Sequence, residues 1–254
     1  MSEPTSDAEA PRPEKEKKKE KEKPSRDPKE WTHQRMETYR TPGNPLEFRP
    51  GDEFFELADR VMHHKRTLLG YDRLYVFWQA AGNLVGVPGA LAEIGSYRGG
   101  SAFFIASAFI LRAGGEVPMH VFDTFEGHPA EALSEHDPFH RPGQFQGTAY
   151  EAVRELLSPF TRLTIHKGDV LQTLPQLEES TYRLVHIDTD LYQPTVACLD
   201  YFGPRMSPGG IIVVDDYASI KCPGVPKAVS EYTNRTTAFQ IWDLRTEQLV
   251  LIKR

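Results

Sequence analysis

The sequence has few cysteines, no long hydrophobic run and no excess of positive charge. Cys198 and Cys222 are the only cysteines among 254 residues, too few for a disulfide framework and without the paired spacing of a zinc site. This pattern is typical of a reducing compartment. No apolar segment approaches the roughly 20 residues that span a bilayer, and the N-terminus lacks the apolar core of a signal peptide. These absences predict a cytoplasmic protein with no membrane partner.

The charge balance argues against a nucleic-acid partner. The formal net charge is −6, whereas nucleic-acid binders usually present a basic face. Residues 1–30 include PRPEKEKKKEKEKPSRDPKE, a mixed-charge run without a large apolar residue, and this composition predicts a disordered tail. Lys17, Lys18 and Lys19 leave open an arm for nucleic acid or anionic lipid, but the neighbouring glutamates dilute their charge.

The rest of the chain divides into a helical segment, residues 31–86, and a predicted catalytic domain, residues 87–254. Apolar residues recur at helical spacing in residues 52–69 and 71–85, which predicts two amphipathic helices with a break near Gly70. Beyond residue 86, short apolar runs alternate with helical stretches, a pattern typical of an α/β fold with a mostly parallel sheet and helices on both faces. The final runs, 238–244 and 248–254, predict an antiparallel hairpin.

A long irregular stretch, residues 124–147, follows the second expected strand. It is rich in Pro, Gly, His and acidic residues, and loops of this length in compact domains are usually functional or mobile. Its position at the carboxyl end of a strand places it where open α/β sheets bind ligands. We therefore interpret it as a lid, in which His136 and His140 are candidates for substrate contact or an alternate base.

A carboxylate occurs near the end of each of the first three expected strands. Glu93 precedes a turn at Gly95 that lacks the G-x-G-x-x-G spacing of dinucleotide folds, and its charge suits a ligand bearing an ammonium and a sulfonium better than a pyrophosphate. Asp123 is placed to accept hydrogen bonds from ribose hydroxyls, and Asp169 from an adenine amino group. Each acid alone is explained equally well as a helix N-cap. Their ordered recurrence predicts a site for an adenosine-bearing cation.

Two further strands each end in a pair of aspartates. Asp188 and Asp190 follow one apolar run, and Asp215 and Asp216 follow the next. Carboxylates at one sheet edge repel each other unless a cation lies between them. Hard oxygen ligands favour Mg²⁺, with Mn²⁺ or Ca²⁺ as geometrical alternatives. Helix capping explains one such aspartate but not four, so the pattern predicts a divalent-metal site.

The segments EIGSYRGGS, VFDTFEGHP, DVLQTLP, HIDTDLY and GGIIVVDDY, in this order, resemble the macrocin O-methyltransferase family. The likeness covers about Val87 to Tyr232. The family includes S-adenosylmethionine-dependent enzymes that methylate sugars on natural products. It implies the class I methyltransferase fold, a Rossmann-like sheet of seven strands in the order 3-2-1-4-5-7-6. It also implies a metal-dependent O-methyltransferase, a glycosylated small-molecule acceptor and a homo-oligomer.

The resemblance also assigns roles to individual residues. It implies Asp188, Asp215 and Asp216 as metal ligands and Asp190 as the general base. The residues implied to contact S-adenosylmethionine are Glu93, Gly95, Ser96, Tyr97, Ser101, Asp123, Thr124, Phe125, Asp169 and Val170. The chain departs from the family at Ser96, Tyr97 and His128, so the identity of the acceptor does not carry over. Leu191 replaces the lysine that serves as base in catechol-type relatives.

Three other functions remain open at this point. A hydroxylase-like relative would share the fold and the cofactor pocket, because a fold does not fix the reaction. A non-catalytic protein that binds S-adenosylmethionine or a macromolecular partner would need neither the base nor the metal. A dinucleotide-dependent dehydrogenase is disfavoured by the glycine spacing.

Overall fold

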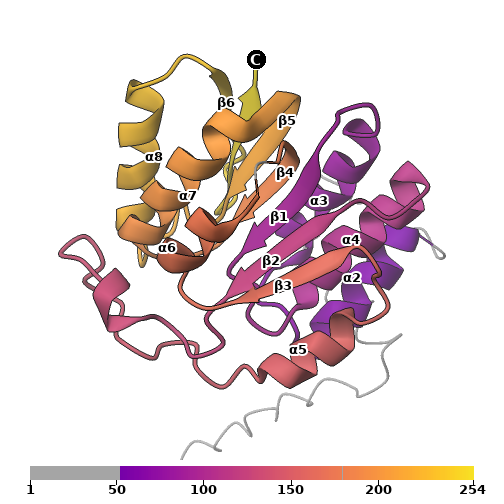
Figure 1. The fold of residues 1–254 in the computed structure, drawn as a ribbon, viewed down its shortest axis with the longest axis horizontal. Coiled ribbons are helices and arrows are strands. Elements are labelled where there is room, and N and C mark those ends of the chain that lie inside the picture. The colour runs from indigo at the N-terminus through magenta and orange to yellow at the C-terminus, as the bar shows by residue number, and fades with distance from the viewer. Residues whose placement is uncertain (1–51, 179) are drawn as a thin grey trace, which may run out of the picture. The chain divides into compact units, whose positions relative to one another are not determined.

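The computed structural model describes residues 52–178 and 180–254, which contain one seven-stranded sheet flanked by helices (Figure 1). The tail predicted over residues 1–30 lies outside the described residues. The strands are β1 (Ala90–Ile94), β2 (Met119–Asp123), β3 (Leu163–Lys167), β4 (Tyr182–Ile187), β5 (Met206–Val214), β6 (Phe239–Asp243) and β7 (Leu249–Lys253). Their order, β3-β2-β1-β4-β5-β7-β6, confirms the order implied by the resemblance.

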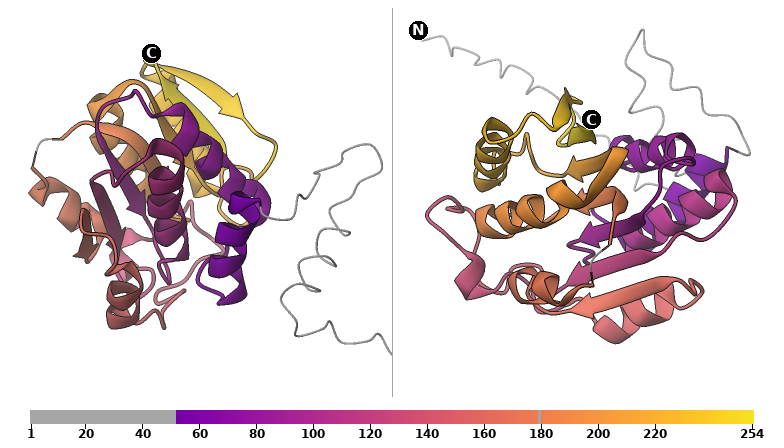
Figure 2. Two further views of the ribbon diagram at one scale, coloured as in Figure 1. Left: turned by 90° about the vertical axis from the view of Figure 1, so that its right-hand side faces the viewer. Right: turned by 45° about the horizontal axis from the view of Figure 1, so that its top comes forward.

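The helices form one layer on each face of the sheet (Figure 2). They are α2 (Glu53–His63), α3 (Tyr71–Asn83), α4 (Gly100–Ala113), α5 (Tyr150–Leu157), α6 (Val170–Thr173), α7 (Tyr192–Arg205) and α8 (Gly224–Asn234). Helices α2, α3 and α4 pack together on one face, and α6, α7 and α8 pack on the other. The two helices expected before residue 86 are confirmed as α2 and α3, while the domain boundary at residue 86 stays a prediction.

The central strands are parallel, and the last two are antiparallel. Strand β1 pairs in parallel with β2 and β4, and β4 pairs in parallel with β5. All five residues of β1 are buried, as expected for a strand covered by helices on both faces. Strands β6 and β7 form the predicted antiparallel edge hairpin. Because β1, β4 and β5 are adjacent and parallel, the residues that follow them gather at one edge of the sheet.

The start of α2 shows how local sequence sets the helical layer. The Asp52 side chain caps the helix by accepting a hydrogen bond from the Phe54 amide at 3.0 Å, which satisfies one of the free N–H groups at a helix start. Residues Phe54, Leu57, Ala58 and Val61 are buried at helical spacing. This apolar stripe packs against α3 and α4 and thereby holds α3 over the sheet.

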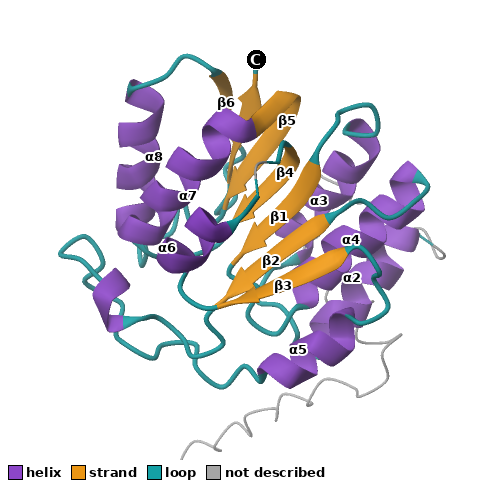
Figure 3. Ribbon diagram, in the orientation of Figure 1, coloured by secondary structure: helices purple, strands orange, loops and turns teal. Residues whose placement is uncertain are grey.

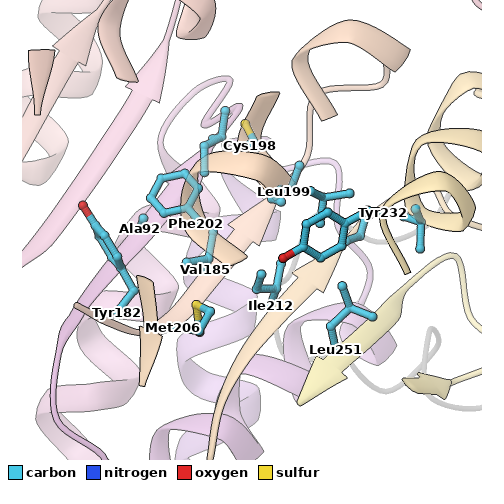
Figure 4. Close-up of a cluster of buried hydrophobic side chains, with 14 of the residues drawn as sticks. Ala92, Tyr182, Val185, Cys198, Leu199, Phe202, Met206, Ile212, Tyr232 and Leu251 are labelled. Carbon is cyan, nitrogen blue, oxygen red and sulfur yellow. The ribbon is translucent and has the colours of Figure 1, made fainter. Parts of the chain in front are cut away.

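The core on the other face lies between the sheet and helices α7 and α8 (Figure 4). Tyr182 from β4 and Phe202 from α7 meet edge to face, with ring centroids 4.9 Å apart. Both side chains are fully buried, and such aromatic pairs add to the stability gained from buried area. Val185 and Ile212 from neighbouring strands complete this layer. Across residues 52–178 and 180–254, none of the helices combines the length and apolar character needed to cross a membrane.

Gly95 determines how closely β1 and β4 approach each other where both strands end. Its φ is +87°, and a Cβ atom there would lie 1.8 Å from the carbonyl oxygen of Asp188. The Asp188 amide donates a hydrogen bond to the carbonyl of the preceding residue, Ile94, at 2.9 Å. Any larger residue would push apart the two chain segments that carry the predicted cofactor turn and the first predicted metal ligand.

We expect Gly95→Ala to lower the free energy of unfolding by at least about 3 kcal/mol, because a strained φ and a backbone clash add together. Urea denaturation measures this loss. Gly114→Ala is the matched control, since Gly114 also has a left-handed backbone, with φ +80°, but a Cβ there meets nothing within 4 Å. Its expected cost is about 1 kcal/mol. Equal losses in the two variants would contradict the close approach of β1 and β4.

Candidate active site

The carboxyl ends of β1, β2, β4 and β5 open into a cavity of about 420 Å³. This volume lies within the range of about 300 to 1,000 Å³ that is usual for small-molecule sites. The predicted site residues that line it are Gly95, Tyr97, Ser101, Asp123, Thr124, Asp169, Val170, Asp188, Asp190, Asp215 and Asp216. Four of the seven described non-glycine residues with a left-handed backbone, including Asp190 and Asp216, also line it. Backbone strain of this kind tends to gather at functional sites.

Asp123 is the centre of the cofactor side of the cavity. One carboxylate oxygen accepts a hydrogen bond from the Tyr97 amide at 2.8 Å, and the other accepts one from the Phe125 amide at 2.6 Å. Burial raises the pKa of Asp123, and these amide hydrogen bonds act against that rise. The carboxylate therefore ties the turn after β1 to the turn after β2 and fixes the geometry of both.

Three of the predicted cofactor residues do not line the cavity. Ser96 and Phe125 are buried in the turns that hold Asp123. Glu93 is placed differently from our expectation, because its fully buried side chain points toward the α3 side of the sheet. Neighbouring side chains on a strand alternate between faces, so Ile94 reaches the cavity and Glu93 does not.

The partner of Glu93 is His186, which sequence reasoning missed. One Glu93 oxygen lies 3.0 Å from Nδ1 of His186 on the adjacent strand β4, and neither side chain is exposed to solvent. The Phe77 ring from α3 covers this pair, and its centroid lies 4.6 Å from the centroid of the His186 ring. Glu93 is thus accounted for by a buried hydrogen-bonded pair. His186 directly follows the apolar residues Leu184 and Val185, and only the pairing of β1 with β4 shows that it lies beside Glu93.

Asp188, Asp215 and Asp216 converge at the opposite end of the cavity. Their nearest carboxylate oxygens all lie within 4.8 Å of one another. Burial, and then the charges of the two neighbours, raise the pKa of Asp188 well above its usual range. Oδ1 of Asp215 is buried and has no hydrogen-bond partner among the described residues. An oxygen-only donor set with an unused buried oxygen fits a divalent ion such as Mg²⁺.

Arg73 from α3 is a second residue that the sequence did not reveal. One of its guanidinium nitrogens lies 2.5 Å from Oδ2 of Asp215 and 3.3 Å from a carboxylate oxygen of Glu247. The other donates a hydrogen bond to the Leu68 carbonyl at 2.9 Å. This contact offsets part of the negative charge of the cluster and acts against the rise that burial causes in the Asp215 pKa. The helical layer therefore contributes directly to the site.

Asp190 lies beside the cluster but faces other partners. Strand β4 ends at Ile187, and Asp190 has φ +60°, so strand alternation does not set the direction of its side chain. Its carboxylate oxygens lie 3.6 Å from Nε2 of His128 and 3.6 Å from Sγ of Cys222. Burial and the neighbouring Asp216 raise the pKa of Asp190. A carboxylate with a raised pKa is a stronger general base.

The loop 124–147, drawn mostly in teal beyond β2 in Figure 3, contributes lining residues to the cavity and is held in place by Asp137. The buried Asp137 carboxylate accepts hydrogen bonds from the Tyr192 amide at the start of α7, at 2.9 Å, and from Ser134. His140 lines the cavity, whereas His136 packs on the Tyr192 ring outside the lining. Of the two histidines considered as substrate contacts, only His140 is therefore placed to meet a bound molecule.

This strand order, with acids at the carboxyl ends of the central strands, defines a class I methyltransferase fold. The chain belongs to the macrocin O-methyltransferase (TylF) family, whose model matches residues 13–241. The O-methyltransferase NovP is similar in structure, with a TM-score of 0.66 and 26% identity over 74% of this chain and 82% of that chain. CalS11, a calicheamicin methyltransferase, has the same fold, with a TM-score of 0.62 and 20% identity over 84% of this chain and 98% of that chain.

Two curated relatives carry names that specify a reaction. An 8-demethyl-8-(2,3-dimethoxy-alpha-L-rhamnosyl)-tetracenomycin-C 4'-O-methyltransferase of Streptomyces olivaceus is 33% identical over 161 residues. That match covers 59% of this chain and 60% of the relative's length. A demethyldecarbamoylnovobiocin O-methyltransferase of Streptomyces niveus is 32% identical over 181 residues, or 65% of this chain and 67% of that protein.

We expect Asp188→Asn to stabilise the protein by about 1 kcal/mol when a chelator is present, because it removes one of several mutually repelling buried charges. The raised pKa sets the sign of the pH dependence. Below the usual carboxyl pKa of about 4 the side chain is protonated and the gain is absent, and the gain grows as the pH rises through the raised pKa. Thermal melts from pH 4 to 8 measure it. Glu131→Gln removes an exposed charge and serves as control; an equal gain there would contradict repulsion within the cluster.

Proposed function

We propose that this protein is an S-adenosylmethionine-dependent O-methyltransferase that requires a divalent metal ion and acts on a sugar hydroxyl of a glycosylated natural product. The observation that carries the proposal is the single cavity that joins Asp123, the three clustered aspartates and Asp190. The names of the two curated relatives support the reaction and the class of acceptor. The cytoplasmic location and the homo-oligomer expected from the sequence stay predictions.

The two ends of the cavity have different tasks. Asp123 and Asp169 offer acceptors for ribose hydroxyls and an adenine amino group, and Gly95 and Tyr97 line the space between them and the other end. Asp188, Asp215 and Asp216 would hold Mg²⁺, or Mn²⁺ or Ca²⁺. When bound, the ion lowers the pKa of a coordinated hydroxyl, and S-adenosylmethionine supplies an electrophilic methyl group.

Asp190 completes the reaction as the general base. It accepts the proton of the acceptor hydroxyl, and the oxygen forms a bond to the methyl carbon as the carbon–sulfur bond breaks. The products are a methyl ether, S-adenosylhomocysteine and a protonated Asp190. Holding the oxygen, methyl carbon and sulfur in line accounts for a large share of the rate, about 7 to 11 kcal/mol in favourable cases.

We expect Asp190→Asn to lower kcat by about 10²- to 10⁴-fold, the usual contribution of a general base, and to leave the affinity for S-adenosylhomocysteine unchanged. Asp123→Asn is the contrasting variant. We expect it to weaken the binding of S-adenosylhomocysteine by about tenfold or more, because hydrogen bonds to a charged acceptor are lost. Calorimetry measures the affinities, and mass spectrometry of a panel of glycosylated acceptors measures turnover. Failure of the wild-type protein to bind S-adenosylhomocysteine would overturn the proposed function.

The rim of the cavity offers apolar surface for the body of the acceptor. Leu68, Phe139 and Phe145 line the cavity, yet the side chains of Leu68 and Phe139 are 61% and 64% exposed. Exposed apolar groups that gather at one cavity mouth are typical of a binding surface. A glycosylated acceptor would place its sugar among the aspartates and its apolar part against this rim.

We expect Phe139→Ala to raise KM for the acceptor by about tenfold, since burying an aromatic side chain contributes about 1.5 to 3 kcal/mol, and to leave kcat within about twofold. Steady-state kinetics with the best acceptor of the panel separates the two constants. Ile241→Ala is the matched control, because Ile241 is 52% exposed on the edge strand β6 and does not line the cavity. An unchanged KM in Phe139→Ala would place the acceptor elsewhere.

A further inference from the structure

A second group of metal-ligating side chains lies in the same cavity, beside the three clustered aspartates. Donor atoms of His140, Asp190 and Cys222 all lie within 4.8 Å of one another. His140 comes from the loop 124–147, Asp190 follows β4, and Cys222 precedes α8. Apart from Asp190, these residues have no part in the methyl transfer proposed above. Their chemistry also differs from that of the aspartate cluster, because it combines imidazole and thiol with a single carboxylate.

The ring of His140 is oriented as a metal ligand. Its Nε2 lies 3.0 Å from the carbonyl oxygen of Lys221. A carbonyl oxygen can only accept, so Nε2 carries the proton and Nδ1 keeps its lone pair. Nδ1 is buried and has no hydrogen-bond partner among the described residues. Metal-binding histidines usually have this arrangement, in which one nitrogen donates to a carbonyl and the other faces the ion.

His128 supplies a fourth donor from the other side of Asp190. Its Nε2 is buried without a hydrogen-bond partner in the described chain, 3.6 Å from one oxygen of Asp190. The rings of His128 and His140 are in edge-to-face contact, with centroids 5.2 Å apart. Two unpartnered imidazole nitrogens therefore meet at one carboxylate.

Two of the distances around Asp190 match the spacing of neighbouring ligands on one ion. With metal–ligand bonds of about 2.0 to 2.3 Å, neighbouring ligands of tetrahedral zinc lie about 3.3 to 3.6 Å apart. The Cys222 thiol donates a hydrogen bond to Oδ1 of Asp190, with Sγ 3.6 Å from that oxygen, and Nε2 of His128 lies 3.6 Å from Oδ2 of the same carboxylate. Cys222 is 3% exposed; it belongs to the hydrophobic core, and its thiol faces Asp190 and His140. The two buried ring nitrogens have no hydrogen-bond partner among the described residues and are therefore available as ligands.

We propose that His140, Cys222, Asp190 and His128 form a zinc site, separate from the aspartate cluster, and that zinc bound there inhibits the enzyme. Imidazole and thiolate ligands select Zn²⁺, whereas Mg²⁺ prefers oxygen ligands. On binding, the Cys222 thiol releases its proton to solvent and the sulfur coordinates the ion. Zinc occupies the Asp190 carboxylate, which can then no longer accept the proton of the acceptor hydroxyl. The proposed zinc binding does not depend on the proposed function, whereas the proposed inhibition rests on that function.

Cobalt titration of the full chain tests the site without using activity, because Co²⁺ replaces Zn²⁺ and a cobalt–thiolate bond gives a charge-transfer absorption band. We expect the band in the wild-type protein, its loss when Zn²⁺ is added, and its loss in Cys222→Ser. Cys198→Ala is the matched control, since Cys198 is the other buried cysteine and lies in the core among Leu199 and Phe202. The triple variant Asp188→Asn, Asp215→Asn, Asp216→Asn lacks the aspartate cluster and is expected to keep the band.

Absence of the band in folded wild-type protein, or its persistence in Cys222→Ser, would overturn the zinc site. Circular dichroism establishes that each variant is folded. If Cys222→Ser is unfolded, His140→Ala takes its place, with an expected loss of Zn²⁺ affinity of about tenfold or more, and an unchanged affinity would contradict the site. Zinc inhibition that a chelator reverses supports the complete proposal. Cobalt binding by a protein that methylates no acceptor supports the zinc site and counts against the proposed function.

Discussion

The structure of the cavity depends on holding several aspartates together in a buried place where they repel each other. Two unit charges 4 Å apart interact by about 4 kcal/mol at an effective dielectric constant of 20, so a cluster of this kind is costly without a counter-charge. Burial and mutual repulsion raise the pKa values of Asp188, Asp190 and Asp215. Arg73 offsets part of the cost through Asp215. The carboxylates of the site therefore repel one another, and a bound cation would reduce this repulsion.

The packing and pairing of the strands hold these aspartates together. Strands β1, β4 and β5 are adjacent and parallel, and their apolar side chains are packed between two helical layers (Figures 2 and 4). The end of each strand is fixed by backbone hydrogen bonds across the edge, such as that from the Asp215 amide to the Ile187 carbonyl at 2.8 Å. Hydrophobic burial of many residues thus offsets the repulsion of a few, an exchange that is common at functional sites.

The proposed base and the proposed zinc site share one carboxylate, which connects catalysis with metal selectivity. Asp190 lies between an oxygen-only cluster on one side and imidazole and thiol donors on the other. An ion that prefers oxygen would leave Asp190 free, while one that prefers nitrogen and sulfur would occupy it. The loop 124–147 brings His128 and His140 to this point, and its fastening at Asp137 keeps them there. Both the identity of the bound metal and the position of the loop would therefore determine whether Asp190 is free to act as the base.

Much of the fold was predictable from the sequence because periodicity is a local property. The alternation of apolar runs and amphipathic segments predicted the layers, and the two final apolar runs predicted the antiparallel edge hairpin. The strand order was implied by the family resemblance that the ordered motifs carry. The convergence of Asp188, Asp215 and Asp216 was also predictable, since parallel neighbouring strands end at the same sheet edge. Apart from the strand order, which the resemblance implied, these inferences need only the order of residues along the chain and the known geometry of parallel sheets.

Other features depended on contacts between residues far apart in the sequence. Glu93 looked like a ligand contact until strand pairing placed it against His186, 93 residues away. Arg73 reaches Asp215 across 142 residues, and no local pattern distinguishes it from any other helical arginine. The sequence by itself determined the sheet, its helices and the acids at its edge, because local pattern and strand geometry specify them. The tertiary structure alone decided which face each side chain meets, because a one-residue alternation or a helix rotation sends it to a different partner.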